Sequence, residues 1–528
     1  MTPSRRDSLL LWLLPALFVA ALFAARAASL PFWQSFNLDP DYYYLLNGLR
    51  IVEGLAPTDV SHPGTPVQVL IAIVIRALHP LAPTSGVVDA VLANPEGHLV
   101  AATTVIYVII GASLWLMGRA AYAWGGLVPA LLAQTSPFLQ SIIVKMALHP
   151  KPEAFLVVAV AGLAAACFAA LRSEGRRDGP ALWAGVAMGF GVACKIHFVA
   201  LGVVPLLLFD RRRLGVYLAA CAVSLLLFVA PMLPSLDIWL DWMHRVILGA
   251  GAYGAGADTV IDPHAYPHNV LRLFSARWFF TGGIIVSLLT LAAYVRLRRR
   301  SLLPADPAIR LLIGTLMGEV VLVLLVAKQP APHYMIPALL LTGPQLAVLW
   351  RITRTFLPAH VHRRAWLGLG AALVVAPAIG TVHQVRELAG WTRATQAFPM
   401  SRFDGCAKVY FDAGSAESFA FQRGDMNAQE RYSPKLAKLF PSDEYTWFIF
   451  DHTWWKHGLM QWNHPVTLDQ LFARYPCVVF RGNQYPQFYK VYVATNKRSY
   501  DDECTVGEER IFTKGVTCEG KRVPVLAK

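Results

Sequence analysis

The chain has 528 residues, of which 55% are hydrophobic and only 15% are charged, whereas soluble proteins carry about 25% charged residues. Its net charge is +14, from 47 basic and 33 acidic residues. Long apolar runs between clusters of charge exclude an ordinary soluble protein and indicate a polytopic helical membrane protein. An outer-membrane barrel would show short alternating segments instead.

Eleven apolar runs are predicted to cross the membrane, because each approaches the length of about 20 residues that a spanning helix needs. They lie at 9–30, 98–118, 126–143, 153–171, 181–195, 196–209, 214–233, 278–296, 309–327, 335–351 and 366–385. The runs 181–195 and 196–209 are short, so the boundary between them is poorly defined. The segment 67–78 is shorter still and contains Arg76, which favours an interfacial or re-entrant helix.

Arginine and lysine are concentrated in the loops on one side of these spans, although the opposite loops are longer in total. The positive-inside rule places the arginine-rich loops in the cytoplasm. The protein is therefore predicted to be a multi-pass protein of the inner (plasma) membrane, with a cytoplasmic N-terminus and an extracytoplasmic C-terminus. This bias explains much of the positive charge, so no nucleic-acid partner is expected. The N-terminus also resembles a cleavable secretory signal, but its long apolar run favours a retained helix.

The chain is predicted to comprise a transmembrane domain, 1–385, and an extracytoplasmic α/β domain, 386–528. Strand-like runs occur at 408–413, 445–450, 477–482 and 488–494, with helical stretches at 433–440 and 467–476. Such alternation is typical of a small α/β domain. Four cysteines in this domain would form two disulfides in an oxidising compartment, with Cys504 and Cys518 the favoured pair among three possible pairings; they are Cys406, Cys477, Cys504 and Cys518.

Two aspartates, Asp39 and Asp41, lie in the stretch NLDPDYYYLLNG just after the first span. Pro40 disfavours helix at Asp39, so Asp41 is predicted to be the N-cap of a new helix. A polar stripe at a spacing of three residues then follows, opposite a leucine-rich face; it comprises Tyr44, Asn47, Arg50 and Glu53. This pattern predicts an amphipathic helix at the membrane surface. Asp41 is either a cap alone or a functional carboxylate.

Further ionisable and aromatic groups are predicted at the outer ends of later spans; they are Glu153, Lys195, His197, Lys328, His333 and Tyr334. Each one alone could be an interfacial residue that snorkels to the headgroups. Together they place a carboxylate and several cations at one depth on one face of the membrane domain. That arrangement suits a substrate with a lipid tail and an anionic head such as a phosphate.

In order, spacing and sidedness, these motifs resemble the GT-C superfamily of integral-membrane glycosyltransferases, which includes protein O-mannosyltransferases and lipid A aminoarabinose transferases. Asp41 and Tyr44 in DPDYYYLLNGL resemble the second acidic position of the first outer loop and its tyrosine. Asp39 lies one residue farther than in a paired acidic motif, because Pro40 intervenes. The stretches KPEAFLVVAVAG, ACKIHF and KQPAPHYMIP resemble later segments of these enzymes. The resemblance covers about 1–385.

The resemblance implies transfer of a sugar from a polyprenyl-phosphate-linked donor to a lipid, glycan or protein acceptor on the outer face of the membrane. Asp41 would be the general base of a single inverting displacement, with Asp39 as the second catalytic candidate. Substrate binding, including stabilisation of the leaving phosphate, would fall to Tyr44, Glu153, Lys195, His197, Lys328, His333 and Tyr334.

No cofactor is implied by these residues. A divalent metal ion could bind among several acidic and histidine side chains, although none has a specific ligand spacing; they are Asp39, Asp41, His62, Glu153, His264 and His268. A transporter or flippase for a lipid-linked or anionic substrate is the main alternative, since Glu319 is an ionisable group within a predicted span. A regulatory membrane partner that binds through its outer domain is a second alternative. The sequence has no inverted repeat of the kind that many transporters show.

Overall fold

The computed structural model describes residues 4–34, 41–173, 177–249, 258–275, 277–411, 416–441, 445–449, 458–462, 464–483, 485–495, 497–507 and 509–523. The chain divides into two compact units. The first comprises Met1–Ala24, Val60–Val69 and Ala102–Gln384, and the second comprises Ala25–Asp59, Leu70–Ala101 and Val385–Lys528. The second unit thus combines the C-terminal residues with two segments from near the N-terminus.

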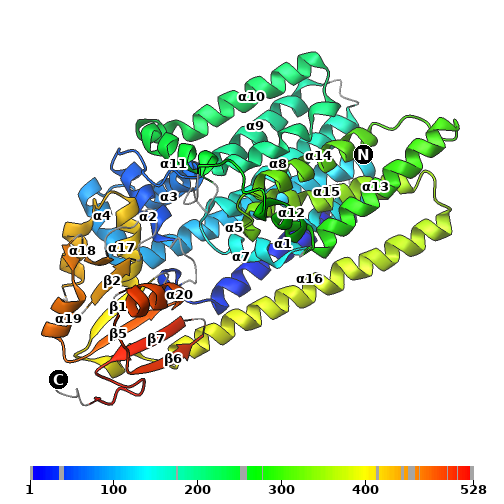
Figure 1. The fold of residues 1–528 in the computed structure, drawn as a ribbon. Helices are drawn as coiled ribbons and strands as arrows, with labels where there is room; N and C mark the ends of the chain where they lie inside the picture. The colour runs from blue at the N-terminus through cyan, green and yellow to red at the C-terminus, as the bar shows by residue number, and fades with distance from the viewer. Residues whose placement is uncertain are drawn as a thin grey trace. The chain divides into compact units, whose positions relative to one another are not determined.

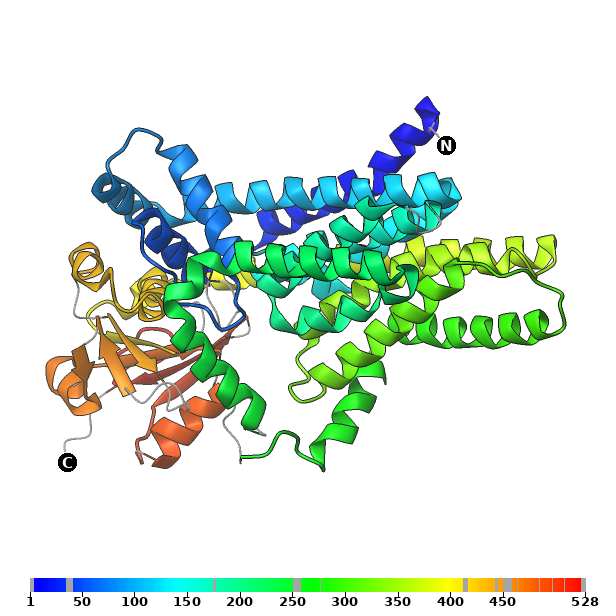
Figure 2. The same cartoon turned by 90° about the horizontal axis from the view of Figure 1, so that it is seen from above.

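The first unit is helical, and its long helices run roughly alongside one another (Figure 1 and Figure 2). Its α-helices are α6 (Leu127–Gln134), α7 (Ser141–Ala147), α8 (Pro152–Arg172), α9 (Asp178–Cys194), α10 (Arg211–Val229), α11 (Leu236–Leu248), α12 (Ala265–Ser275), α13 (Trp278–Arg299), α14 (Ala308–Val326) and α15 (Ile336–Thr353). Its 3₁₀ helices are η2 (Ser136–Phe138), η3 (Ile196–Val203), η4 (Leu206–Leu208), η5 (Ala230–Ser235) and η7 (Pro332–Met335). Four helices have residues in both units; they are α1 (Arg5–Ala28), α3 (Thr65–Leu78), α5 (Pro95–Gly125) and α16 (Ala359–Gln396).

Among the described residues, eight helical segments are long and apolar enough to cross a membrane, and a bent pair, Leu127–Phe138 with Ser141–Ala147, would add a ninth. These nine correspond to nine of the predicted spans. The other two predictions are corrected: α9 has 17 residues and is about 26 Å long, short of a hydrocarbon core of about 30 Å. The run 196–209 forms the 3₁₀ helices η3 and η4 rather than a regular α-helix. The segment 67–78, predicted to be interfacial or re-entrant, forms a short apolar helix, α3.

Helices α9 and α10 pack closely because α9 presents glycine residues to α10. A Cβ atom on Gly185 would lie 2.3 Å from the backbone oxygen of Tyr217, and one on Gly189 would lie 2.4 Å from that of Cys221. Small residues four positions apart allow helix backbones to approach each other in a membrane. This contact fixes α9, at whose C-terminal end Lys195 is located.

The second unit contains one mixed sheet among its described residues, in the order β4-β3-β2-β1-β5-β7-β6, in which β1 pairs in parallel with β2 and β5. The strands, visible in Figure 1, are β1 (Ala407–Phe411), β2 (Tyr445–Ile449), β3 (Gly458–Gln461), β4 (His464–Val466), β5 (Val478–Gly482), β6 (Asp502–Val506) and β7 (Glu509–Lys514). Its helices are η1 (Phe32–Gln34), α2 (Tyr42–Val52), α4 (Thr84–Ala93), η8 (Met400–Phe403), α17 (Glu417–Asn427), α18 (Ser433–Leu439), α19 (Leu468–Arg474), α20 (Tyr485–Phe488) and η9 (Tyr489–Thr495).

Three of the four predicted strands in this region are confirmed as β1, β2 and β5, and both predicted helices are confirmed as α18 and α19. The strand predicted at 488–494 is wrong, because that run forms α20 and the π-helix η9. The run imitates a strand because it is rich in aromatic and β-branched residues, which are common in strands. In the structure, however, Phe488 and Tyr492 stack with ring centroids 4.8 Å apart, and both pack on Phe480 of the sheet.

The described C-terminal residues contain two disulfide bonds, Cys406–Cys477 and Cys504–Cys518. The second is the pairing that the sequence favours. The first connects the residue before β1 to the residue before β5, and so joins two adjacent parallel strands. Both bonds border a small apolar cluster that includes Val479 and Ile511.

We expect loss of the Cys406–Cys477 bond to destabilise this unit more than loss of the Cys504–Cys518 bond. The bonds close loops with sequence separations of 71 and 14 residues, and loop-closure entropy grows with loop length. Removing a native disulfide typically costs about 2–5 kcal/mol. Thermal unfolding of purified Cys406→Ser and Cys504→Ser variants would measure the difference. A larger loss in Cys504→Ser would contradict the expectation.

Candidate functional site

A buried ion pair lies at one end of the first unit. Glu153 is in the first turn of α8, and Lys195 directly follows the last residue of α9. The Lys195 Nζ atom is 2.5 Å from Glu153 Oε1, and the side chains are 2% and 6% exposed. Charges so poorly solvated are stable only when paired, so each residue constrains the position of the other.

Backbone hydrogen bonds bring His62 to this pair. The amide of Ile196 donates to the carbonyl oxygen of His62 at 2.8 Å, and the amide of Gly64 donates to the carbonyl oxygen of Ala193 at 3.1 Å. Lys195 has an extended backbone there, which allows this strand-like bridge. Removal of the imidazolium from water holds the pKa of His62 well below its ordinary value of 6.5, and the charge of Lys195 adds to the effect.

Aromatic rings complete the polar cluster. Tyr334 comes from η7, and the Lys195 Nζ atom lies 4.9 Å from the centroid of its ring, a cation–π geometry. The His197 ring, which is buried in η3, is 5.4 Å from Tyr334, and the His333 ring is 4.2 Å from it. The structure therefore gathers five residues that the sequence nominated: Glu153, Lys195, His197, His333 and Tyr334.

The cluster opens into a cavity of about 420 Å³ within the first unit. Its polar lining consists of Ser61, His62, Lys195, His197, Tyr266, Lys328, Gln329 and Tyr334. Its apolar lining includes Val199, Trp242, Met243, Val246, Ile247, Val260, Ile261, Leu324, Leu325 and Val326. A largely apolar cavity whose lining also contains lysine, histidine and tyrosine side chains can accommodate an amphiphile with an anionic head.

Lys328, a predicted phosphate ligand, lies at the edge of this cavity. Its Nζ atom donates to the carbonyl oxygen of Ile247, 2.5 Å away, in the last turn of α11. Cations favour the carbonyl end of a helix because of its partial negative charge. Helix α12 is held to the end of α14 in a similar way, since Tyr266 donates to the carbonyl oxygen of Leu324 at 2.6 Å.

The remaining nominated residues belong to the second unit. Asp39 lies outside the described residues. Asp41 is fully buried and precedes α2, which begins at Tyr42 as predicted. Asp41 is the N-cap residue of α2, as predicted, but its side chain makes no capping hydrogen bond to the described backbone of α2, where the Asp41 backbone is helical (φ −59°, ψ −18°) instead of extended. Tyr44 is also buried, at 2% exposure.

Sequence reasoning misjudged the role of His62 and missed helix α17. His62 was considered only as a metal ligand, and its neighbour Lys195 is more than a hundred residues away in the sequence, so no local pattern could connect them. Helix α17, which contacts α2, was not predicted at all. Among the described residues, no three His, Cys, Asp or Glu side chains are grouped to hold a metal ion.

Comparison with known proteins gives structural matches only. No protein-family model matches the chain, and no curated protein sequence matches it. The crystal structure of ArnT from Cupriavidus metallidurans bound to undecaprenyl phosphate is similar over 94% of this chain and 97% of that chain, with a TM-score of 0.46 and 11% identity. The apo structure of the same protein gives a TM-score of 0.48 and 12% identity over the same shares. The archaeal oligosaccharyltransferase AglB from Archaeoglobus fulgidus, in complex with an inhibitory peptide and a dolichol-phosphate, gives 0.42 and 11% over 74% of this chain and 58% of that chain.

These proteins represent the GT-C class of membrane glycosyltransferases, the class that the sequence motifs resemble. Their TM-scores all lie below 0.5, and such a likeness carries no argument about activity. The case for a function therefore depends on the cavity and side chains of this chain.

We expect Glu153→Gln to destabilise the first unit strongly, because it leaves the Lys195 ammonium buried without its counter-charge. Breaking a buried pair from one side typically costs about 3–5 kcal/mol. The double variant Glu153→Gln with Lys195→Met removes both charges and should recover much of that loss. Thermal unfolding in detergent would compare the three proteins. Equal stability of the single and double variants would contradict the importance of the pair.

Proposed function

We propose that this chain is a membrane glycosyltransferase that takes its sugar from a polyprenyl-phosphate-linked donor. The observation that carries the proposal is the cavity of the first unit, whose lining is mostly apolar and includes the polar cluster of His62, Lys195 and Tyr334. An isoprenoid chain gains free energy by leaving water for aliphatic surroundings, and a phosphate needs charged or polar donors. The same lining would not suit a water-soluble nucleotide sugar.

The leaving phosphate would be stabilised by the polar cluster. The charge of Lys195 is largely balanced by Glu153 before a donor arrives. An added anion would then favour protonation of a nearby imidazole, and His62 is the candidate because its pKa is low in the absence of an anion. His197, His333 and Lys328 would contribute further donors to the phosphate.

The acceptor would be activated by Asp41. The carboxylate takes the proton of the acceptor hydroxyl while the hydroxyl oxygen forms a bond to the anomeric carbon. The bond from that carbon to the phosphate oxygen breaks, and its electron pair remains on the lipid phosphate. One base and one stabilised leaving group are sufficient for a single displacement, which inverts the anomeric centre. Asp39 stays the second candidate for the base.

Transfer on the outer face of the cytoplasmic membrane follows from the predicted topology, with lipid, glycan or protein as the acceptor class.

The transporter alternative depended on Glu319, which is fully buried in α14. Its Oε2 atom accepts a hydrogen bond from Gln345 Nε2 at 3.1 Å, within the packing of α14 against α15. Glu319 does not line the cavity formed by the described residues, so we favour the transferase.

We expect Asp41→Asn to abolish transfer while leaving folding and donor binding unchanged. The substitution preserves shape but removes the proton acceptor, and loss of a positioned base typically lowers the rate by about 10²- to 10⁴-fold. Mass spectrometry of the lipid-linked donor and the glycosylated acceptor in reconstituted membranes would measure it. Asp39→Asn serves as the matched control and should have a smaller effect. An active Asp41→Asn protein, or an inactive Asp39→Asn protein, would show that the base is assigned to the wrong residue.

We also expect donor binding to strengthen as the pH falls from 7.5 to 5.5. If the phosphate raises the pKa of His62, binding takes up a proton, and affinity then increases at low pH by at most about tenfold per pH unit. A sugar-linked undecaprenyl phosphate in vesicles is a suitable probe, because its phosphodiester does not titrate between these pH values, whereas a phosphate monoester titrates at about pH 6. His62→Gln should make the affinity independent of pH over this range, whereas His264→Gln should not. A pH dependence that persists in His62→Gln would assign the proton to another group.

A further inference from the structure

Helix α17 approaches the backbone of α2 at the residue that follows Asp41. A Cβ atom on Gly424 would lie 3.0 Å from both the carbonyl carbon and the carbonyl oxygen of Tyr42, and 3.1 Å from its Cβ atom. A glycine accommodates this approach without displacement, whereas a Cβ atom at these distances would require its neighbour to move by a few tenths of an ångström. Tyr42 has a second tie to α17, since its hydroxyl is 3.1 Å from Glu417 Oε1.

The C-terminal end of α17 is capped by side chains of α2 and of the segment that follows it. The last carbonyl groups of a helix lack partners within the helix. Here Asn47 Nδ2 and Thr58 Oγ1 donate to the carbonyl oxygen of Asn427, at 3.4 and 2.6 Å. Arg50 Nη1 donates to the carbonyl oxygen of Ala428 at 2.9 Å, where a cation is also favoured by the helix dipole.

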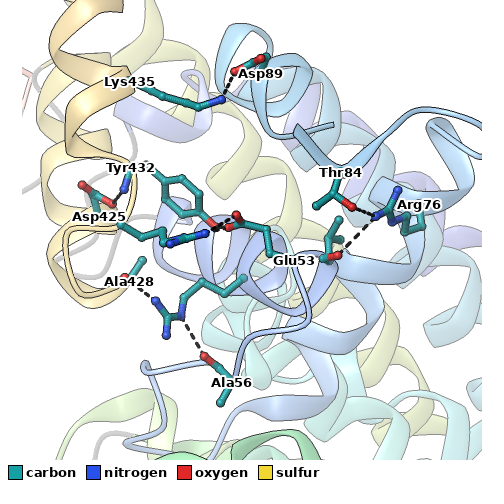
Figure 3. Close-up of polar contacts among 12 residues, drawn as sticks. Glu53, Ala56, Arg76, Thr84, Asp89, Asp425, Ala428, Tyr432 and Lys435 are labelled. Carbon is teal, nitrogen blue, oxygen red and sulfur yellow. Dashed lines mark hydrogen bonds and ion pairs between the residues drawn. The ribbon is translucent and has the colours of Figure 1, made fainter. Parts of the chain in front are cut away.

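The chain beyond α17 extends the contact to the end of α2 (Figure 3). Arg431 Nη2 lies 2.8 Å from Glu53 Oε1, and the hydroxyl of Tyr432 donates to Glu53 Oε2 at 2.8 Å. Asp425 fixes this turn, since Oδ1 accepts from the amide of Tyr432 at 2.7 Å and Oδ2 accepts from the Ser433 hydroxyl at 2.6 Å. Three residues of the polar stripe, Asn47, Arg50 and Glu53, are thus bonded to α17 or to the chain that follows it.

We propose that α17 is the positioning element for Asp41 and that Gly424 is the positioning residue at its centre. The inference rests on the proposed role of Asp41 as the base. A side chain at position 424 must displace Tyr42, and with it Asp41, by a few tenths of an ångström. Proton transfer needs hydrogen-bond distance, and a misplacement of about 1 Å can cost about 100-fold in rate. The C-terminal region is then a working part of the transferase.

The test compares glycines that differ only in what surrounds them. Gly424→Ala should lower kcat about tenfold, and Gly424→Val should lower it further, while donor affinity stays at the wild-type value. Alanine is a better helix former than glycine, so loss of the helix itself is not expected. Gly390 in α16 has no atom within 4 Å of the position that a Cβ atom would take, so Gly390→Ala and Gly390→Val are the matched controls. They should leave kcat unchanged.

A second comparison applies if Gly424→Val does not fold. Two carboxylates form ion pairs with the chain after α17: Glu53 with Arg431, and Asp89 with Lys435. Glu53 directly follows α2, whereas Asp89 lies in α4. Glu53→Gln should lower kcat several-fold, and Asp89→Asn should not. The positioning role is contradicted if both Gly424→Ala and Glu53→Gln have a normal kcat, or if they lose only donor affinity.

The variants also separate this role from the proposed role of Asp41. An active Asp41→Asn protein would contradict the assignment of Asp41 as the base. An inactive Asp41→Asn protein together with a fully active Gly424→Ala protein would support the base and contradict only the positioning role.

Discussion

The buried pair of Glu153 and Lys195 is the constraint on which the cavity of the first unit depends. It joins the first turn of α8 to the residue after α9, in surroundings where neither charge is solvated. Lys195 also contacts the other polar groups of the cluster. Its backbone forms a bridge with Pro63, next to His62, and its ammonium group lies over the ring of Tyr334. The close packing of α9 on α10 through Gly185 and Gly189 holds this arrangement from the other side of α9.

The apolar pattern of the sequence was sufficient to predict most of the membrane helices, because a hydrocarbon environment leaves few alternatives to a long apolar helix. It failed at 196–209, where the sequence is as apolar as a span but the backbone is 3₁₀. Hydropathy measures composition, and nothing in composition separates a 3₁₀ from an α-helix. The π-helical run 489–495 was mistaken for a strand for a related reason, since its tyrosine and valine residues are typical of strands whatever backbone they adopt.

The sequence predicted several individual residues of the candidate site, but it could not predict which residues lie together in space. The charged ends of spans identified Glu153, Lys195, His197 and Tyr334, because an ionisable group at a membrane edge is rare without a cause. His62 and Gly424 could not be identified in this way. His62 accepts a hydrogen bond from the backbone of Ile196, and Gly424 lies against the backbone of Tyr42. These contacts join residues that are far apart in the sequence, so no local sequence pattern indicates them.

The contact between Arg50 and Ala428 spans 378 positions in the chain, and this separation has a consequence for biosynthesis. Helix α2 emerges among the first elements from the ribosome, whereas the carbonyl groups that Arg50 and Asn47 bond belong to residues made near the end. At about 5–20 residues per second, the interval is on the order of 20–75 s. During that time the partners of α2 on α17 have not yet been synthesised. The segment that contains α2 is therefore among the last parts of the chain to reach its final contacts, and a ribosome that stalls within the C-terminal coding region releases a chain in which α2 lacks these partners.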